Sequence, residues 1–164
     1  MFNYCGFNFV PVKRMELVNK KEILKTFTLQ IVKSNAAFRQ YLQTKLKQHE
    51  IDLTVEMLQV LKQLWCRDGI NQQEIADLVV KDKTSVTYLI DNLSRRKLVY
   101  RIEDAEDRRN KLVFLTPEGA ALRQTIEPWL QELQAEIGRG ISAENLQQCL
   151  AVLEKVRANL GSLK

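Results

Sequence analysis

The sequence predicts a mainly α-helical protein with one small β-hairpin, arranged as a winged helix-turn-helix domain between helical flanking segments. Three observations predict this fold class. Apolar residues recur at three- and four-residue steps through most of the 164-residue chain, which is typical of amphipathic helices. Between residues 98 and 115 the pattern changes to two short strands. The length fits one domain with extensions, and the chain shows no internal repeat.

The N-terminal region is expected to contain an irregular arm and then one long helix. Residues 1–14 are rich in Phe and Asn and predict the arm, and Met15 is an alternative start. Residues 15–52 follow as a dimerisation segment, with a helix from about Leu17 to Gln48. This helix is too long to bury its whole apolar stripe against a small partner, which favours a dimer.

Two helices are expected to open the central domain, residues 53–116. Thr54 is a candidate N-cap for a helix that runs to about Arg67 and ends at Asp68-Gly69. Asn71 and Glu74 resemble a capping box at the start of a shorter helix. We expect four residues of that shorter helix to be buried: Ile75, Ala76, Leu78 and Val79.

The next helix begins at Asp82, runs to about Arg96, and combines an apolar stripe with a polar face. The stripe has the helical spacing 0, 3, 4 and 7, formed by Val86, Leu89, Ile90 and Leu93. The remaining positions are small, polar or aromatic and are expected to face away from the core: Thr84, Ser85, Thr87, Tyr88, Asp91 and Asn92.

A hairpin and two helices complete the chain. Strands are expected at 98–102 and 111–115, joined by a highly charged tip. Thr116 and Pro117 form a strong helix start, and Pro128 predicts a kink or break within that helix. Ser142 starts the last helix. These two helices occupy residues 117–164.

The polar-faced helix is a candidate reading element for DNA. The major groove admits an α-helix, and short hydroxyl side chains can hydrogen-bond bases or phosphates. Lys83 and the Arg95-Arg96-Lys97 cluster suit phosphates, and Asp107-Arg108-Arg109 places two guanidinium groups at the hairpin tip. The alternatives are a solvated helix face and a surface charge cluster. The net charge of +5 permits an anionic partner without requiring one.

The central segment also carries several spaced motifs that occur together. They are LT-x-E at Leu53–Glu56, DG-x-x-Q-x-E-x-A at Asp68–Ala76, KD-K-x-x-VT at Lys81–Thr87, I-D-x-L at Ile90–Leu93, DRR at Asp107–Arg109 and LT-x-x-G at Leu115–Gly119. In this order and spacing the segment closely resembles the MarR (multiple antibiotic resistance regulator) family.

The resemblance implies a homodimeric, sequence-specific DNA-binding transcriptional regulator, usually a repressor, on a pseudo-palindromic operator. It also implies that the first helix and the C-terminal helices, residues 117–164, form the dimer interface. The residue matching Arg109 enters the minor groove in that family, and the residue matching Asp107 positions it. Together with the residues chosen from their chemistry, the candidate DNA-binding set is Lys83, Thr84, Ser85, Thr87, Tyr88, Asn92, Arg95, Arg96, Arg108 and Arg109. The alternative is a winged-helix protein-interaction module that lacks sequence-specific DNA binding.

Departures from the family pattern concern the reading helix and the wing. The family often has Arg where Tyr88 stands and a basic or polar residue where Asn92 stands, so base preference is expected to differ. Lys97 replaces a common Gly, which predicts either a strained Lys97 or a different helix end. Ala105 replaces a common Pro in the wing.

An effector pocket for a small aromatic acid is a further expectation from the resemblance. Its candidate walls are Phe38, Tyr41 and Trp65.

Other site classes are not supported by the residues. His49 is the only histidine, and Cys5, Cys66 and Cys149 form no CxxC pair, so neither a metal site nor a cofactor is predicted. Cys66 and Cys149 are expected to be buried and inert. No nucleophile–base pair or phosphate loop indicates an enzyme. No apolar run reaches membrane-spanning length, and a cytoplasmic location is expected.

Overall fold

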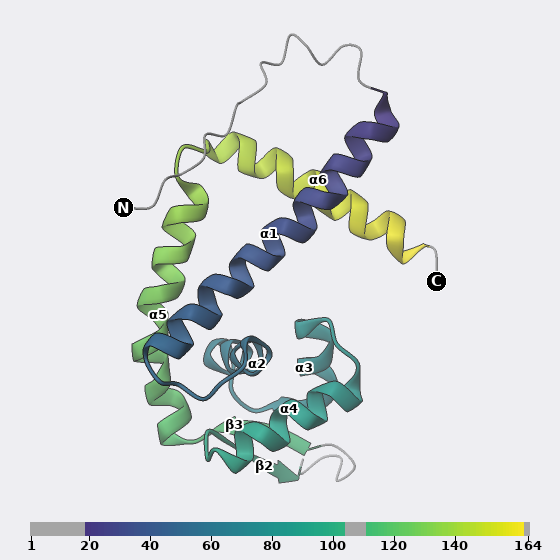
Figure 1. Ribbon diagram of the computed structural model, residues 1–164. Coiled ribbons are helices and arrows are strands. Elements are labelled where there is room, and N and C mark those ends of the chain that lie inside the picture. Colours follow the sequence, from purple (N-terminus) through teal and green to yellow (C-terminus); the bar gives the residue numbers. More distant parts are fainter. Residues whose placement is uncertain (1–18, 104–110, 163–164) are drawn as a thin grey trace. The chain divides into compact units, whose positions relative to one another are not determined.

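The computed structural model describes residues 19–103 and 111–162 (Figure 1). The chain divides into two units, residues 1–40 and 41–164, and each is described by itself. The predicted arm, Met15, Cys5, Ala105 and the hairpin tip lie outside the described residues. The elements, in chain order, are α1 (Lys20–Gln48), α2 (Val55–Cys66), β1 (Ile70–Asn71), α3 (Gln72–Val79), α4 (Lys83–Arg95), β2 (Val99–Glu103), β3 (Lys111–Leu115), α5 (Pro117–Gly138) and α6 (Ala143–Gly161).

The predicted helix starts are confirmed by their capping hydrogen bonds. In each case a side-chain oxygen at the N-cap accepts a hydrogen bond from a backbone N–H three residues later, which satisfies one of the unpaired donors of the first turn. The capping residues are Thr54 for α2, Asn71 for α3, Asp82 for α4, Thr116 for α5 and Ser142 for α6. Pro128 does not break α5, which continues as one helix to Gly138.

The strands form a three-stranded antiparallel sheet in the order β1-β3-β2. The predicted hairpin is confirmed, with Val99 opposite Leu115 and Arg101 opposite Val113. Strand β1 was not predicted because two residues are too few to show a strand period. It pairs Ile70 with Val113, after a turn in which Gly69 has a φ of +69°.

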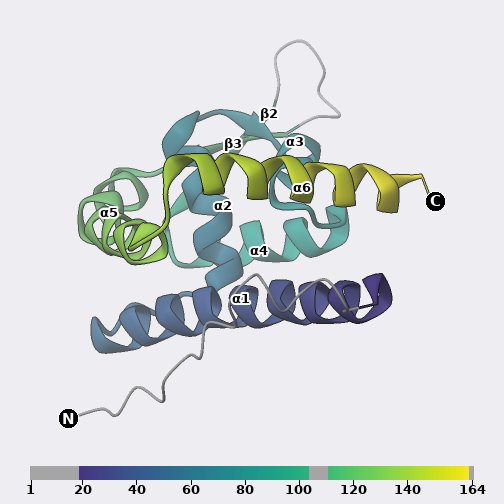
Figure 2. The ribbon, with the colours of Figure 1, turned by 90° about the horizontal axis from the view of Figure 1, so that it is seen from above.

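The main core lies between α2, α3, α4 and the sheet. Figures 1 and 2 both place α2 beside α4, and α4 also contacts β2. The stripe predicted for α4 is confirmed, because all four of its residues are buried. The buried members of this core are Met57, Val60, Leu61, Leu64, Ile70, Ile75, Ala76, Val86, Leu89, Ile90, Leu93, Val99 and Val113.

A second buried cluster joins the end of α1 to α2 and α5. Its buried members are Leu46, Leu58, Ile126, Trp129 and Leu130. His49 follows the end of α1, and the centroid of its ring lies 4.4 Å from that of Trp129.

The start of α5 also packs tightly on the hairpin. A Cβ built on Gly119 would lie 2.0 Å from the Leu98 carbonyl oxygen, so only glycine fits at this contact.

Two expectations about α3 need correction. Leu78 was expected to be buried, but it is 48% exposed, because the short helix turns only the face that carries Ile75 and Ala76 to the core. The expected capping box is half formed. Asn71 caps Glu74 N–H, whereas the Glu74 carboxylate pairs with Arg67 instead of returning to the N-cap.

Large apolar side chains remain exposed on α1 and α6. The part of α1 in the first unit exposes Ile23, Leu24, Leu29, Ile31, Val32 and Phe38. None of the described residues of α6 is buried, and Leu150 is 59% exposed. Among the described residues, no helix is long and apolar enough to cross a membrane.

Candidate nucleic-acid interface

The turn between α3 and α4 sets the direction of the polar-faced helix. Val80 ends α3 in the left-handed region, with φ 54° and ψ 52°, and it is 89% exposed. Asp82 then caps α4, accepting a 2.8 Å hydrogen bond from Ser85 N–H and a 2.6 Å bond from the Ser85 hydroxyl. These bonds from Ser85 lower the pKa of the Asp82 carboxyl, since they favour its charged form.

The exposed face of α4 contains four of the predicted DNA-binding residues. Lys83, Thr84, Tyr88 and Arg95 are all exposed, and Tyr88 is 64% exposed. By helical spacing, Thr84, Tyr88 and Arg95 lie opposite the apolar stripe that anchors α4 in the core, whereas Lys83, in the first turn, lies nearer to that stripe. The arrangement therefore presents hydroxyl, phenol and cationic groups from one rigid helix.

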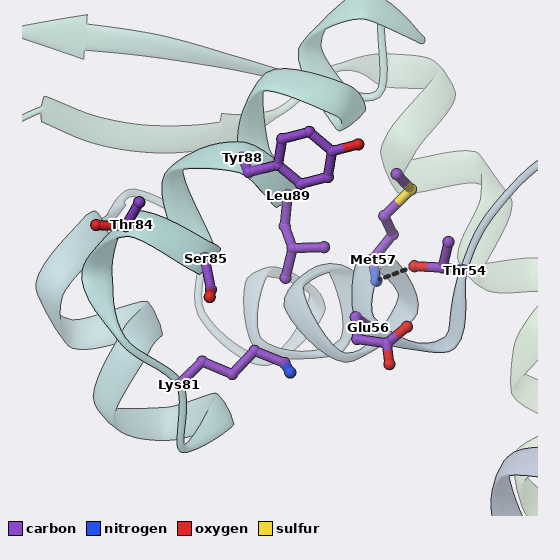
Figure 3. Close-up of a pocket in the computed structure, with 8 residues that line it drawn as sticks. All are labelled: Thr54, Glu56, Met57, Lys81, Thr84, Ser85, Tyr88 and Leu89. Atoms are coloured by element: carbon purple, nitrogen blue, oxygen red, sulfur yellow. Dashed lines mark hydrogen bonds between the residues drawn. The ribbon is translucent and has the colours of Figure 1, made fainter.

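A groove of about 500 Å³ runs beside this face (Figure 3). Thr84, Ser85, Tyr88 and Leu89 of α4 form one side of it. The start of α2 forms the other side through Thr54, Glu56 and Met57, and Lys81 of the turn completes the lining.

Two of the predicted hydroxyl groups are already engaged inside the domain. The Ser85 hydroxyl bonds to its cap residue, as described above. The Thr87 hydroxyl donates to the Lys83 carbonyl at 2.9 Å and accepts from Gln72 Nε2 at 3.1 Å. Both side chains are half-buried.

Asn92 was predicted to face away from the core, and this was wrong. It is 7% exposed. Its Nδ2 donates to the Tyr88 carbonyl at 2.8 Å, and its Oδ1 accepts from Arg95 at 2.9 Å. Because both ends of the amide are used within the protein, Asn92 holds Arg95 in place and does not belong to the exposed reading face.

Arg96 was predicted to suit a phosphate, but the fold gives it an internal role. Its Nε donates to the Asp52 carbonyl at 2.8 Å, and the guanidinium pairs with the Asp52 carboxylate at 2.6 Å. A further bond runs to the Asn92 carbonyl. Arg96 therefore ties the end of α4 to the segment before α2.

Lys97, which stands where the family commonly has Gly, adopts a left-handed conformation with φ 57°. Its backbone N–H bonds to the Ser94 carbonyl, and its own carbonyl accepts from the Thr116 hydroxyl at 2.6 Å. The first of the two sequence alternatives, a strained Lys97, is the one observed.

The wing contacts the reading helix through a residue that the sequence reasoning missed. Arg101 of β2 forms a 2.7 Å ion pair with Asp91 of α4. The alternation of β2 could have indicated it, since an Arg stands there at an inward position. Asp107, Arg108 and Arg109 lie outside the described residues, so their predicted roles remain predictions.

The three residues proposed for an effector pocket are not assembled into one cavity by the described contacts. The Tyr41 hydroxyl donates to the Trp129 carbonyl at 3.1 Å, and burial raises the Tyr41 pKa, aided by a hydrogen bond with Glu132. Trp65 Nε1 donates to the Gly119 carbonyl at 2.9 Å. Phe38 belongs to the other unit and is 39% exposed.

The expectation that Cys66 and Cys149 are buried was wrong for the single chain. Both thiols are free and exposed. Cys66 is the last residue of α2, where the helix leaves the core, and Cys149 lies on the unburied helix α6.

The sequence and fold were compared with those of known proteins. Residues 53–111 match the family model described as "MarR family". Two structures of S. aureus MepR match with a TM-score of 0.74 and 29% identity over 82% of this chain, one in a DNA-binding conformation and one in complex with DNA. The matches cover 98% and 97% of the MepR chains. Residues 53–111 therefore form a MarR-family domain.

A second relative extends the comparison of the MarR-family fold. A cysteine-to-serine mutant of E. coli MarR, complexed with operator DNA, has a TM-score of 0.72 and 24% identity, over 85% of this chain and 99% of that one. At this identity the match supports the fold alone. The family model spans α2, α3, α4, both intervening turns and β2, which includes every described candidate residue of the reading helix.

Proposed function

We propose that this MarR-family protein binds a pseudo-palindromic operator as a homodimer and represses transcription. In this proposal α4 of each subunit enters a major groove, and the β2–β3 wing approaches the adjacent minor groove. The observation that carries the proposal is the exposed face of α4, where Lys83, Thr84, Tyr88 and Arg95 project from a helix fixed by its buried stripe.

The charge distribution of the reading domain supports an anionic partner despite a nearly balanced composition. Asp82 is used as a helix cap, and Asp91 is paired with Arg101. These two carboxylates therefore have partners within the domain, whereas Lys83 stays exposed at the start of α4. Phosphate contacts of this kind release counterions, so affinity is expected to fall as salt rises.

The homodimer is supported by the exposed apolar residues of α1 and α6. Large apolar patches on a protein surface usually mark interaction sites. Two reading heads on a two-fold axis would meet half-sites about 10 base pairs apart, one turn of the duplex. The proposed division is then 15–52 and 117–164 for dimerisation and 53–116 for DNA binding.

The function is tested by binding of the purified protein to duplex DNA from upstream of its own reading frame, with a scrambled duplex as competitor. Measurements at about 50 mM and 200 mM salt should show preference for the native duplex and weaker binding at high salt. Thr84→Ala should weaken specific binding roughly tenfold, because it removes a hydroxyl from the reading face. Thr125→Ala, an exposed threonine on α5, is the matched control.

Two results would contradict the proposal. One is equal affinity for the native and scrambled duplexes at both salt concentrations. The other is an affinity independent of salt, which would contradict the assigned phosphate contacts. Arg109→Ala tests the wing separately, and unchanged binding by that variant would remove Arg109 from the interface.

A second candidate function is a protein-interaction module on the same fold. It is favoured by exposed apolar side chains near the reading face: Tyr88 is 64% exposed, and Tyr100 and Ile102 on β2 are 44% and 48% exposed. Lack of any DNA preference, together with a retained dimer, is the outcome that this function predicts.

A further inference from the structure

We infer that the Arg101–Asp91 ion pair is a positioning device that fixes the wing against the reading helix and thereby controls how the wing reads the minor groove. The inference rests on the proposed DNA-binding function. It concerns two residues outside the candidate DNA-binding set, and neither is required to touch DNA.

Arg101 makes contact with two successive turns of α4. One terminal nitrogen lies 2.7 Å from Asp91 Oδ1, and the other lies 3.5 Å from the carbonyl oxygen of Thr87. Thr87 and Asp91 are four residues apart and therefore share one face of the helix. Because a guanidinium is planar and rigid, two contacts fix its orientation as well as its distance from the helix.

The setting of Arg101 points to positioning rather than to simple stabilisation. Its side chain is 22% exposed, and it stands opposite the fully buried Val113 on the inner face of the sheet. Its Nε is buried and has no hydrogen-bond partner. An apolar residue would fill the same place without that desolvation cost, so stability gives little reason for an arginine here.

The contact continues from the wing to α3. The Thr87 residue whose carbonyl meets Arg101 also accepts a hydrogen bond from Gln72 Nε2 through its hydroxyl. The helices α3 and α4 and the strand β2 are thereby joined through polar groups. A strand rises about 3.3 Å per residue. A change in the angle of β2 at Arg101 therefore displaces the residues farther along the strand.

The hairpin does not depend on the ion pair for its folding. Val99 and Val113 bury their side chains in the core, and β3 pairs with both β1 and β2. An Arg101→Met variant keeps most of the aliphatic stem and should therefore keep the fold. What it loses is the fixed angle between β2 and α4.

The test uses the full-length protein and the duplex of about 30 base pairs that it binds best from a randomised pool, three helical turns in length. Three versions of that duplex carry A·T, G·C or inosine·C pairs in the flanks that the wings face. Inosine lacks the amino group that G places in the minor groove, so inosine·C resembles A·T there and G·C in the major groove. The ratio of affinities among them reports minor-groove reading.

The wild-type protein should bind the A·T and inosine·C flanks about tenfold more tightly than the G·C flanks. Arg101→Met and Asp91→Ala should each reduce that ratio to about twofold and leave discrimination at the central half-sites unchanged. The double variant should be no worse than either single one, because both remove the same interaction. Arg139→Met, which removes an exposed charge that pairs with Glu136, should leave the ratio unchanged.

Two results would overturn the inference while leaving the proposed function intact. One is an unchanged flank ratio in both single variants. The other is an equal loss of affinity for all three duplexes together with a lower unfolding temperature, which is the signature of a purely structural role. If the wild-type protein selects no duplex from the pool, the proposed function fails, and the inference fails with it.

Discussion

Among the residues that the structure describes, three that are not glycine take a left-handed backbone conformation: Glu50, Val80 and Lys97. This conformation brings Cβ close to the following carbonyl oxygen. It is therefore least favourable for a β-branched residue such as valine. Val80 and Lys97 end the two helices of the helix-turn-helix, α3 and α4. Two of these three strained positions therefore flank the reading helix α4.

Replacing Lys97 with glycine should stabilise the protein by about 1 kcal/mol, because glycine removes the Cβ that opposes a positive φ. The matched control is Lys62→Gly, at an exposed right-handed position inside α2, which should cost about 0.5–1 kcal/mol. Urea unfolding of the two variants, which carry the same charge change, measures the difference. A destabilised Lys97→Gly protein would contradict the backbone argument.

Asn92 and Arg96 illustrate residue roles that depend on tertiary neighbours. Asn92 was chosen because it was expected on the polar face of the reading helix, and Arg96 because its guanidinium suits phosphates. In the fold each finds a partner inside the protein: Asn92 bonds to Tyr88 and Arg95, and Arg96 bonds to Asp52. Residue type alone could not reveal these partners, since Asp52 is 44 residues away in the sequence.

At the scale of elements, short local signals predicted the helix starts correctly. An N-cap depends on a side chain and a backbone N–H only three residues apart, so the information lies within one turn. The same locality explains why β1 was missed. That strand exists only because residues 112 and 113 of β3 pair with it from a distant part of the chain.

The cap of α4 should also make stability depend on pH. The pKa of Asp82 is lowered in the folded protein by its bonds to Ser85. A lowered folded-state pKa stabilises the fold above the ordinary carboxyl pKa, and that stabilisation is lost as pH falls through the folded-state value. The loss is therefore expected as pH falls below the ordinary aspartate pKa of about 3.9, toward the lower folded-state value.

Asp82→Asn keeps an acceptor oxygen at the N-cap but cannot titrate, so its stability should fall less steeply with acid than that of the wild type. Asp77→Asn, an exposed aspartate on α3 that caps no helix, is the control. Denaturant unfolding at a series of pH values gives both slopes. Identical acid slopes for Asp82→Asn and the wild type would refute the assignment.

At the scale of the whole molecule, α6 is the element whose surroundings the single chain does not explain. It exposes Leu150 and Leu160 by 59% and 60%, and none of its described residues is buried. A helix with an apolar stripe gains stability only by covering that stripe. A second copy of the chain is the partner that the proposed function requires.

Leu150→Glu should therefore weaken the dimer, raising its dissociation constant roughly 100-fold, because it places a carboxylate in the proposed interface. Gln148→Glu adds the same charge at an exposed position about 200° around α6 from Leu150 and should leave the dimer intact. Sedimentation equilibrium distinguishes the two. Dimers of equal strength in both variants would place the interface elsewhere.

The sequence by itself determined the order of the elements other than β1, the helix caps, the apolar stripe of α4, the hairpin and the resemblance to the MarR family, because these depend on local spacing. Tertiary structure alone decided that Asn92 is internal, that Arg96 binds Asp52, that Leu78 is exposed and that Arg101 joins the wing to α4. The physical reason is that a polar side chain forms hydrogen bonds or ion pairs with the groups that the fold brings within reach of it. That partner is set by packing between segments far apart in the chain.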